Sequence, residues 1–173
     1  MLSTASGTIW VPKLYITIDT VLRDRGWAMR EILPGKLWLG NAGDVRDPEP
    51  LLQAGVVAVL NLALEEASLA MPRGMIYCHF PIMDGAQDVQ GVLHLAIQTL
   101  VSLVKNQVPT LVHCGAGMSR SPAIVAAALA VVEGGSPDER LRQIVAGHPR
   151  DVSAQLWEAV QMVCHKFKLA GTI

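Results

Sequence analysis

Apolar and polar residues along this chain form blocks that predict strands and helices in turn. Short apolar runs bounded by glycine or proline predict strands in LPGKLWLGN (33–41), VVAVLNLA (56–63), GMIYCHFPI (74–82) and VPTLVH (108–113). Helical spacing and helix stop signals predict helices over about 47–55, 89–105, 121–133, 136–147 and 153–168. This alternation predicts an α/β fold with a central, mostly parallel twisted sheet of about four to five strands, flanked by helices.

Two of the predicted helices differ in how their apolar residues are distributed. In the helix over 89–105 they lie on one face, at Val92, Leu93, Ala96, Ile97, Leu100, Leu103 and Val104. The helix over 121–133 is apolar almost all round, so it should lie in the interior. Ser136, Pro137 and Glu139 then fit a capping box that opens the next helix.

The length of 173 residues favours one domain. Residues 1–30 contain KLYITI, a plausible edge strand, but no pattern strong enough for a separate unit. We therefore expect an N-terminal extension over residues 1–30, packed on a single domain over residues 31–170.

Charge and composition restrict the partners. The formal net charge is −1, so no broad basic field would attract nucleic acid or an anionic membrane. The longest apolar run, 123–132, is shorter than the roughly 20 residues that span a bilayer. The first twenty residues lack the features of a secretory signal. The three cysteines, Cys78, Cys114 and Cys164, have no paired spacing, which favours a reducing compartment. We expect a soluble, cytoplasmic monomer.

The stretch HCGAGMSRS, residues 113–121, joins a predicted strand to the predicted buried helix. Gly115 and Gly117 permit a loop whose N–H groups point inward, and the helix N-terminus adds positive potential at the same place. Arg120 adds a planar fork of donors that matches two phosphate oxygens. The sequence therefore predicts a binding site for a dianion.

Cys114, at the mouth of this loop, is expected to be largely ionised at neutral pH, because helix N-termini and cations favour the thiolate. Ser121 is expected to donate a hydrogen bond to its sulfur and so to stabilise the thiolate as a leaving group. His113 is expected to hold the loop by hydrogen bonds and not to act as a base.

This loop resembles the signature of the cysteine-dependent protein tyrosine phosphatases, and GMSRS is similar to their dual-specificity branch. LPGKLWLGN, VVAVLNLA and PIMDG are similar to that branch's opening strand, central strand and general-acid segment. HPRDVSAQLW resembles the turn before its last helix, with Ser153 and Ala154 where a Pro-Asn pair is usual. The resemblance covers roughly residues 32–163 and implies a dual-specificity phosphatase-like catalytic domain.

The resemblance implies a phosphomonoester hydrolase that acts on phosphoprotein, with phosphotyrosine and phosphoserine or phosphothreonine as substrates, and that uses no metal or cofactor. Cys114 would be the nucleophile, Arg120 the phosphate clamp and Asp84 the general acid and base. The phosphate cradle would be formed by the backbone N–H groups of Gly115, Ala116, Gly117, Met118, Ser119 and Arg120. Asp88, four residues after Asp84, stays open as the alternative acid.

Other functions remain open at this point. A sulfurtransferase or an arsenate reductase also uses a cysteine in an anion loop, and a phosphatase fold that has lost activity could bind phosphate without turnover. A small-molecule or lipid phosphate is another possible substrate, although Ala116, Met118 and Ser119 lack the charge that a polyanionic inositol phosphate would favour.

Several further residues are expected to have structural roles. Cys78 and Cys164 should be small core residues, and Asn61 should tie down loop backbone. Packing or polar roles are expected for the histidines without metal-ligand spacing, which are His79, His94, His148 and His165.

Overall fold

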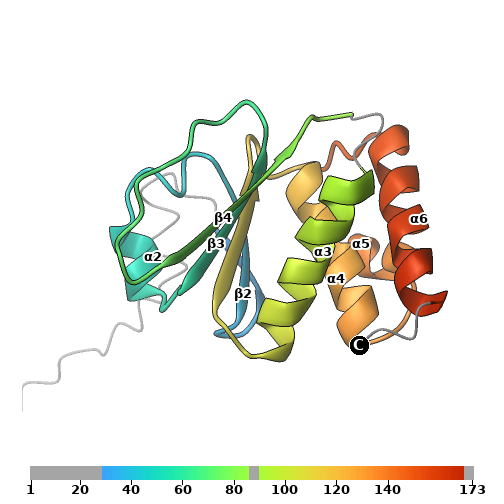
Figure 1. Cartoon of the computed structure of the whole chain (residues 1–173), viewed down its shortest axis with the longest axis horizontal. Coiled ribbons are helices and arrows are strands. Elements are labelled where there is room, and N and C mark those ends of the chain that lie inside the picture. Colours follow the sequence, from blue (N-terminus) through green and yellow to red (C-terminus); the bar gives the residue numbers. More distant parts are fainter. Residues whose placement is uncertain (1–28, 86–89, 170–173) are drawn as a thin grey trace, which may run out of the picture.

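A computed structural model describes residues 29–85 and 90–169 of the chain (Figure 1). Within these residues the strands are β1 (Arg30–Leu33), β2 (Leu37–Asn41), β3 (Ala58–Ala63), β4 (Ile76–Ile82) and β5 (Thr110–Cys114). They form one sheet in the order β1-β2-β5-β3-β4. Only β1 pairs antiparallel, with β2, and the other pairs are parallel. The predicted fold class, a mostly parallel sheet of four to five strands, is confirmed.

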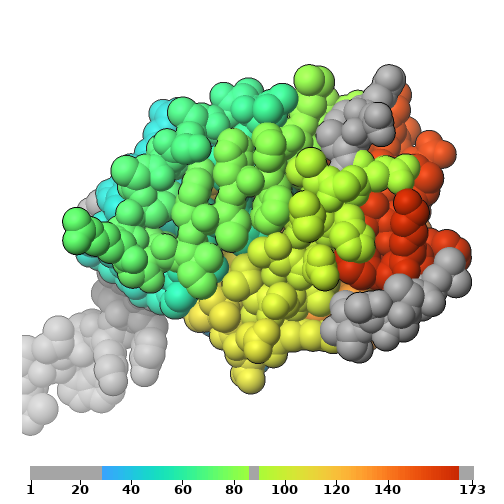
Figure 2. Space-filling model, viewed as in Figure 1, coloured from blue at the N-terminus to red at the C-terminus, as the bar shows by residue number. Residues whose placement is uncertain are grey.

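Helices cover both faces of the sheet. They are α2 (Glu49–Gln53), α3 (Gln90–Lys105), α4 (Arg120–Val132), α5 (Pro137–Val145) and α6 (Ala154–Leu169). Figure 1 shows α3 to α6 on one side of the sheet and α2 on the other. In the space-filling view of the same side, β4 and α3 form much of the surface (Figure 2). None of the helices in the described part of the chain is long and apolar enough to cross a membrane.

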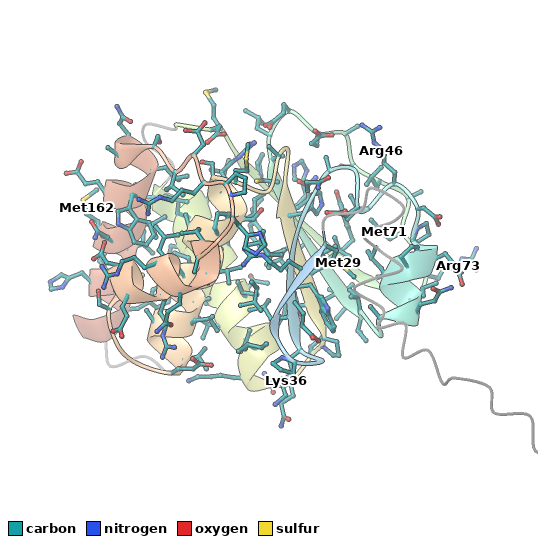
Figure 3. The ribbon with its side chains drawn as sticks, turned by 180° about the vertical axis from the view of Figure 1, so that it is seen from behind. Met29, Lys36, Arg46, Met71, Arg73 and Met162 are labelled. Atoms are coloured by element: carbon teal, nitrogen blue, oxygen red, sulfur yellow. The ribbon has the colours of Figure 1, made fainter. Side chains whose placement is uncertain are left out.

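Two apolar clusters correspond to these two faces. The larger joins one face of the sheet to α3, α4, α5 and α6. The smaller packs Leu51 of α2 against Trp38, Val59 and Leu111, with Met29 beside them. Seen from behind, Met29 and Met71 lie on the α2 side, whereas Met162 lies on the far side, on α6 (Figure 3). The central strands β3 and β5 are buried on both faces, which explains why their sequences are continuous apolar runs.

Helix α4 is the central element of the larger cluster. It contacts α3, α5, α6 and the sheet, and its residues from Arg120 to Ala130 are all buried. Alanines at positions 123, 126, 127, 128 and 130 let these neighbours approach closely from several sides. The prediction that this segment forms an interior helix is confirmed.

The short strand predicted in LPGKLWLGN, bounded by Gly and Pro, is β2, but the strand that pairs with it at the sheet edge, β1, was not predicted. Arg30–Leu33 and Leu37–Asn41 are separate paired strands, and Lys36 N–H donates to the Leu33 carbonyl at 3.0 Å across the turn. Gly35 adopts φ +66°, a conformation that glycine accepts without strain. The Pro-Gly pair thus marks a turn within the segment.

The predicted extension over residues 1–30, with its KLYITI strand, lies almost wholly outside the described residues. Arg30 already begins β1, and Met29 is buried in the smaller cluster.

Ser136 caps the N-terminus of α5. Its hydroxyl accepts a 3.2 Å hydrogen bond from Asp138 N–H, as a helix cap requires.

The close packing around α4 predicts that it does not tolerate larger side chains. Ala126→Leu should lower the free energy of unfolding by about 1–3 kcal/mol, because Ala126 is fully buried and added methylenes overpack the core. Urea denaturation measures this effect. Leu95→Ala, at a half-exposed position of α3, is the control and should change stability by no more than about 0.5 kcal/mol. Unchanged stability of Ala126→Leu would contradict the close packing.

Candidate active site

Cys114 is the last residue of β5, the strand in the middle of the sheet, and is buried. Its neighbours β2 and β3 run parallel to β5 and end at the same edge. Ligands of open α/β sheets bind outside the carboxyl ends of such strands. The segment from Gly115 to Ser119 follows Cys114 and leads directly into α4, which begins at Arg120.

Neighbouring segments hold this loop from two sides. The Gly115 carbonyl accepts a 3.0 Å hydrogen bond from Ala42 N–H, and the Met118 carbonyl accepts one of 2.9 Å from Asp151 N–H. Gly117 has φ +74°, and a Cβ there would lie 2.8 Å from the Gly40 carbonyl oxygen. The Gly115 and Met118 carbonyls thus accept hydrogen bonds from other parts of the protein. This suits a loop that presents its N–H groups to an anion.

Arg120 is nearly inaccessible to solvent, and its guanidinium joins three segments. Nη1 donates to Glu65 Oε2 at 2.6 Å and to the Ile82 carbonyl at 2.8 Å, and Nη2 donates to Glu65 Oε1. Burial lowers the pKa of Arg120, but the hydrogen bonds to Glu65 and the charges of Cys114, Glu65 and Asp84 outweigh it and raise the pKa. The side chain is therefore a permanent cation at the loop.

Glu65 was not among the predicted site residues. It lies two residues after the end of β3, its side chain is 53% exposed, and the hydrogen bond from Arg120 lowers its pKa. One signal was present in the sequence, since the acidic pair Glu65 and Glu66 directly follows a strand of a parallel sheet. Side chains that follow such strands meet at one edge of the sheet.

Asp84 is brought to the same loop. It follows β4, its Oδ1 accepts a 2.6 Å hydrogen bond from the Ser119 hydroxyl, and its Oδ2 lies 3.9 Å from Arg120 Nη2. Its side chain is half-exposed, so it can meet a ligand that enters from solvent. Asp88, the alternative, lies outside the described residues.

Ser121 and His113 flank the cysteine region but do not make the predicted contacts. The Ser121 hydroxyl is buried and has no hydrogen-bond partner among the described residues, so the predicted bond to sulfur is not formed in this structure. The ring nitrogens of His113 form no hydrogen bond of ordinary geometry in the described part of the chain, although the Cys114 backbone interacts with the ring and opposes the fall of its pKa. Burial lowers the pKa of His113 to about 4, so the ring is neutral at pH 7.

The end of β3 is fixed by two polar side chains. Asn61 Oδ1 accepts from Ala63 N–H at 2.9 Å, and Asn61 Nδ2 donates to the Tyr77 hydroxyl at 3.0 Å. His79 Nε2 lies 2.9 Å from the Ala63 carbonyl oxygen. Asn61 thus binds backbone, as predicted, but the bound group belongs to Ala63, the last residue of β3, and not to a loop.

Three residues that were predicted to have packing roles, His94, Cys164 and Cys78, contact apolar neighbours. His94 stacks on Phe167 with ring centroids 4.4 Å apart, Cys164 is buried, and Cys78 packs partly buried against the larger cluster. Their predicted packing roles are confirmed. Among residues 29–85 and 90–169, no three His, Cys, Asp or Glu side chains are placed to hold a metal ion.

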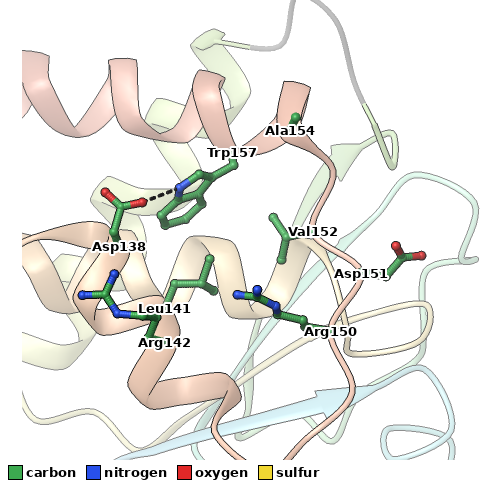
Figure 4. A pocket seen from close by; sticks show the side chains of 8 residues that line it. All are labelled: Asp138, Leu141, Arg142, Arg150, Asp151, Val152, Ala154 and Trp157. Carbon is green, nitrogen blue, oxygen red and sulfur yellow. Dashed lines mark hydrogen bonds between the residues drawn. The ribbon is translucent and has the colours of Figure 1, made fainter.

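A separate cavity of about 500 Å³ lies between α5, α6 and the segment that joins them (Figure 4). Its lining residues are Asp138, Leu141, Arg142, Arg150, Asp151, Val152, Ala154 and Trp157. Asp138 accepts a 2.8 Å hydrogen bond from Trp157 Nε1, which ties α5 to α6. The cavity meets the loop through Asp151, whose N–H binds Met118, and neither Cys114 nor Arg120 lines it. It is a neighbouring cleft, distinct from the loop of residues 115–119.

Comparisons with known proteins identify the family to which the chain belongs. Residues 42–134, more than half of the chain, match the family described as a polymorphic toxin system DSP-PTPase phosphatase. The chain is 32% identical to the dual specificity protein phosphatase Mpk3 of Drosophila melanogaster over 80% of its length and 34% of that protein. It is 31% identical to human dual specificity protein phosphatase 22 over 70% of its length and 65% of that protein.

The fold is also that of solved phosphatases. The crystal structure of human DUSP28 superposes with a TM-score of 0.71 at 23% identity, over 83% of this chain and 99% of that chain. The chain therefore belongs to the dual-specificity phosphatases of the protein tyrosine phosphatase superfamily, and the predicted family is confirmed. It spans from about a third to two thirds of the length of these curated relatives.

The buried neutral His113 predicts a pH dependence of stability. The pKa of His113 is about 4 in the folded protein, against about 6.5 for an ordinary histidine. Between these two pH values His113 is protonated in the unfolded chain but neutral in the folded protein, so the free energy of unfolding falls as pH falls. The free energy of unfolding should be lower by roughly 3 kcal/mol at pH 4 than above pH 6.5. Urea unfolding at several pH values measures it.

Two variants separate the contribution of His113 from that of other titrating groups. His113→Asn should flatten the profile between pH 6.5 and 4 by about this amount, whereas His165→Gln, at an exposed position of α6, should leave it unchanged. A profile of His113→Asn parallel to that of the parent would show that folded His113 titrates normally.

Proposed function

We propose that this chain hydrolyses phosphomonoesters on phosphorylated proteins through a phosphocysteine intermediate. The observation that carries the proposal is the convergence of three groups on one loop. Cys114 precedes the loop, Arg120 follows it, and Asp84 accepts a hydrogen bond from Ser119 within it. A nucleophile, a cation and an acid placed together in this way suit phosphoryl transfer.

In the first step the Cys114 thiolate attacks phosphorus. The sulfur–phosphorus bond forms as the bond from phosphorus to the departing oxygen breaks, and Asp84 gives that oxygen its proton. Arg120 and the backbone N–H groups of the loop stabilise the charge on the equatorial oxygens. The protonated alcohol or phenol leaves.

In the second step a water molecule attacks the phosphocysteine. Asp84, now a carboxylate, takes a proton from the water, and the sulfur–phosphorus bond breaks to release inorganic phosphate and the thiolate. The buried Ser121 hydroxyl, which has no partner among the described residues, would donate to the departing sulfur at this stage.

The surroundings of the loop favour a monoester on a protein. Ala116, Met118 and Ser119 add no positive charge, and the carboxylates of Glu65 and Asp84 lie at the loop. Carboxylates in these positions disfavour ligands that carry several further phosphate groups. A phosphorylated side chain presents one phosphate and therefore suits the site better than an inositol polyphosphate.

The nucleophile assignment predicts the effect of Cys114→Ser. This variant should lose at least about a thousandfold in kcat for p-nitrophenyl phosphate with its fold intact, because a hydroxyl is far less ionised than a thiol. Phosphate release measures the rate, with and without a chelator. Cys78→Ser, at a partly buried thiol of β4, is the control and should keep the parent rate. Turnover of thiosulfate in place of the phosphate ester would refute the proposed function.

The acid assignment predicts that the loss in Asp84→Asn depends on the leaving group. For an alkyl phosphate kcat should fall by about 10² to 10⁴-fold, because the departing oxygen needs a proton. The loss should be smaller for an activated aryl phosphate, and the acidic limb of the pH profile should change shape. Rates on phosphoserine and p-nitrophenyl phosphate measure the difference.

Asp88→Asn is the matched control and should behave like the parent. If it shows the leaving-group dependence and Asp84→Asn does not, Asp88 is the acid.

A further inference from the structure

We propose that the loop of residues 115–119 recognises a phosphoprotein segment with a basic side chain on one flank of the phosphorylated residue and an acidic side chain on the other. Glu66 binds the basic side chain, and Arg142 and Arg150 bind the acidic one. The inference rests on the proposed function and adds to it the charge pattern of the substrate. It follows from these three charged side chains, which lie beside the loop and have no partner among the described residues.

Two of the three side chains line the cleft between α5 and α6. Arg142 belongs to α5, Arg150 belongs to the segment between α5 and α6, and the cleft has a volume of about 500 Å³. Figure 4 shows Arg150 extending from that segment toward α5, whereas Asp151 points to the opposite side. The volume lies in the range of pockets that take a small ligand, so a peptide side chain can enter.

The positive charge of the cleft is available to a ligand. Neither Arg142 nor Arg150 forms a hydrogen bond or an ion pair within the described residues. Asp138, the carboxylate on the cleft wall, already accepts hydrogen bonds from Trp157 Nε1 and Gln161 Nε2. Guanidinium groups without acceptors favour a carboxylate, because their planar fork of donors binds two oxygens together.

The cleft is continuous with the active-site loop. Asp151, the residue after Arg150, donates its backbone N–H to the Met118 carbonyl at 2.9 Å. A Cβ at Gly85, in the turn that holds the proposed acid, would lie 4.0 Å from Ser153 Oγ. An extended peptide advances by about 3.3–3.6 Å per residue, so a peptide whose phosphate occupies the loop has the cleft within reach of a neighbouring side chain.

Glu66 supplies the opposite charge at the start of the same loop. Its Oε1 lies 3.9 Å from the position that a Cβ of Gly115 would take. Unlike Glu65, which binds Arg120, Glu66 forms no hydrogen bond or ion pair among residues 29–85 and 90–169. A free carboxylate beside an anion site repels a phosphate ligand unless the ligand also brings a cation. Glu66 therefore favours a lysine or arginine next to the phosphorylated residue.

The carboxylate and the two arginines lie toward different faces of the sheet. After Glu66 the chain continues over the α2 face, where Leu69, Met71 and Met75 pack against the smaller cluster. Helices α5 and α6, which form the cleft, pack in the larger cluster on the other face (Figure 1). A peptide laid across the loop therefore meets negative charge on one flank and positive charge on the other.

The experiment compares three phosphotyrosine peptides as substrates of the full chain. One has lysine before the phosphotyrosine and glutamate after it, the second has these two exchanged, and the third has alanine at both positions. One of the charged peptides should exceed the alanine peptide in kcat/KM by about 3- to 10-fold and the exchanged peptide by about 10- to 50-fold, mainly through KM. The preference should shrink in high salt, which screens exposed charges. Equal values for the three peptides, or a loss in both charged ones, would overturn the proposal.

Single variants assign each flank. The ratio of kcat/KM between the two charged peptides is measured in one protein preparation, so it does not depend on the fraction that is folded. Arg150→Gln and Glu66→Gln should each lower this ratio about 3- to 10-fold, because each removes an attraction to one peptide and a repulsion of the other. Lys36→Gln is the control and should keep the parent ratio, because Lys36 is exposed at the amino end of β2, away from the loop (Figure 3).

An exchange of charge gives the sharpest result. Glu66→Lys combined with Arg150→Glu should reverse the preference, so that the peptide disfavoured by the parent becomes the better substrate. If this double variant keeps the preference of the parent, another surface sorts the peptides and the proposal fails.

The outcome also separates this inference from the proposed function. Turnover of all three peptides with equal kcat/KM refutes only the recognition of charge. If the parent releases no phosphate, the proposed function fails, and calorimetric titration of the same peptides still tests the recognition. Tighter binding of one charged peptide than of the exchanged one, with the difference reduced in Arg150→Gln, supports it. Equal binding of the peptides, or no binding to the parent, refutes it.

Discussion

The buried guanidinium of Arg120 is the interaction on which the site depends. A cation removed from water requires a counter-ion and acceptors in fixed positions, because its desolvation is otherwise uncompensated. Glu65 after β3 and the Ile82 carbonyl at the end of β4 meet this requirement, and Asp84 adds a second negative charge nearby. The first residue of α4 is thereby tied to the ends of two strands that are distant in the sequence.

The rest of the fold keeps this arrangement rigid. Strand β5 delivers Cys114 to the middle of the sheet edge, and α4 runs back through the larger apolar cluster, where small side chains allow close packing on several sides. The loop between them is bound by Ala42 and Asp151, from two other parts of the chain. A loop anchored at both ends and at two points between them can present its N–H groups without rearrangement, as electrostatic stabilisation of a transition state requires.

The features that could be predicted from the sequence are those that depend on residues close together in the chain. Apolar runs were sufficient to predict β2 to β5, and apolar periodicity and stop signals were sufficient to predict the helices; the cysteine, glycines and arginine of the loop lie close together in the chain. Strand β1 (Arg30–Leu33) was missed, and with it the hairpin around Pro34 and Gly35, because β1 is short and half-polar. The absent bond of Ser121 depends on side-chain geometry within the buried loop, which residue order does not specify.

Glu65 was missed for another reason. Its partner lies 55 positions further along the chain, and the pairing exists only because β3 and β5 are neighbours in the sheet. An acidic residue after a strand is also common at a solvated turn. Only the parallel register of β3 with β5, together with the bound backbone of Ala63, distinguishes it from a surface residue.

In the proposed mechanism the phosphoryl group is transferred to Cys114 during turnover. Rapid acid quenching of the enzyme with a phosphoester substrate, followed by peptide mass spectrometry, tests this most directly. We expect one added phosphoryl group on the peptide that contains Cys114, at a higher level in Asp84→Asn if the loss of the base slows hydrolysis of the intermediate more than its formation. Phosphate release without any modified Cys114 peptide, or a phosphoryl group on another residue, would show that Cys114 is not the nucleophile.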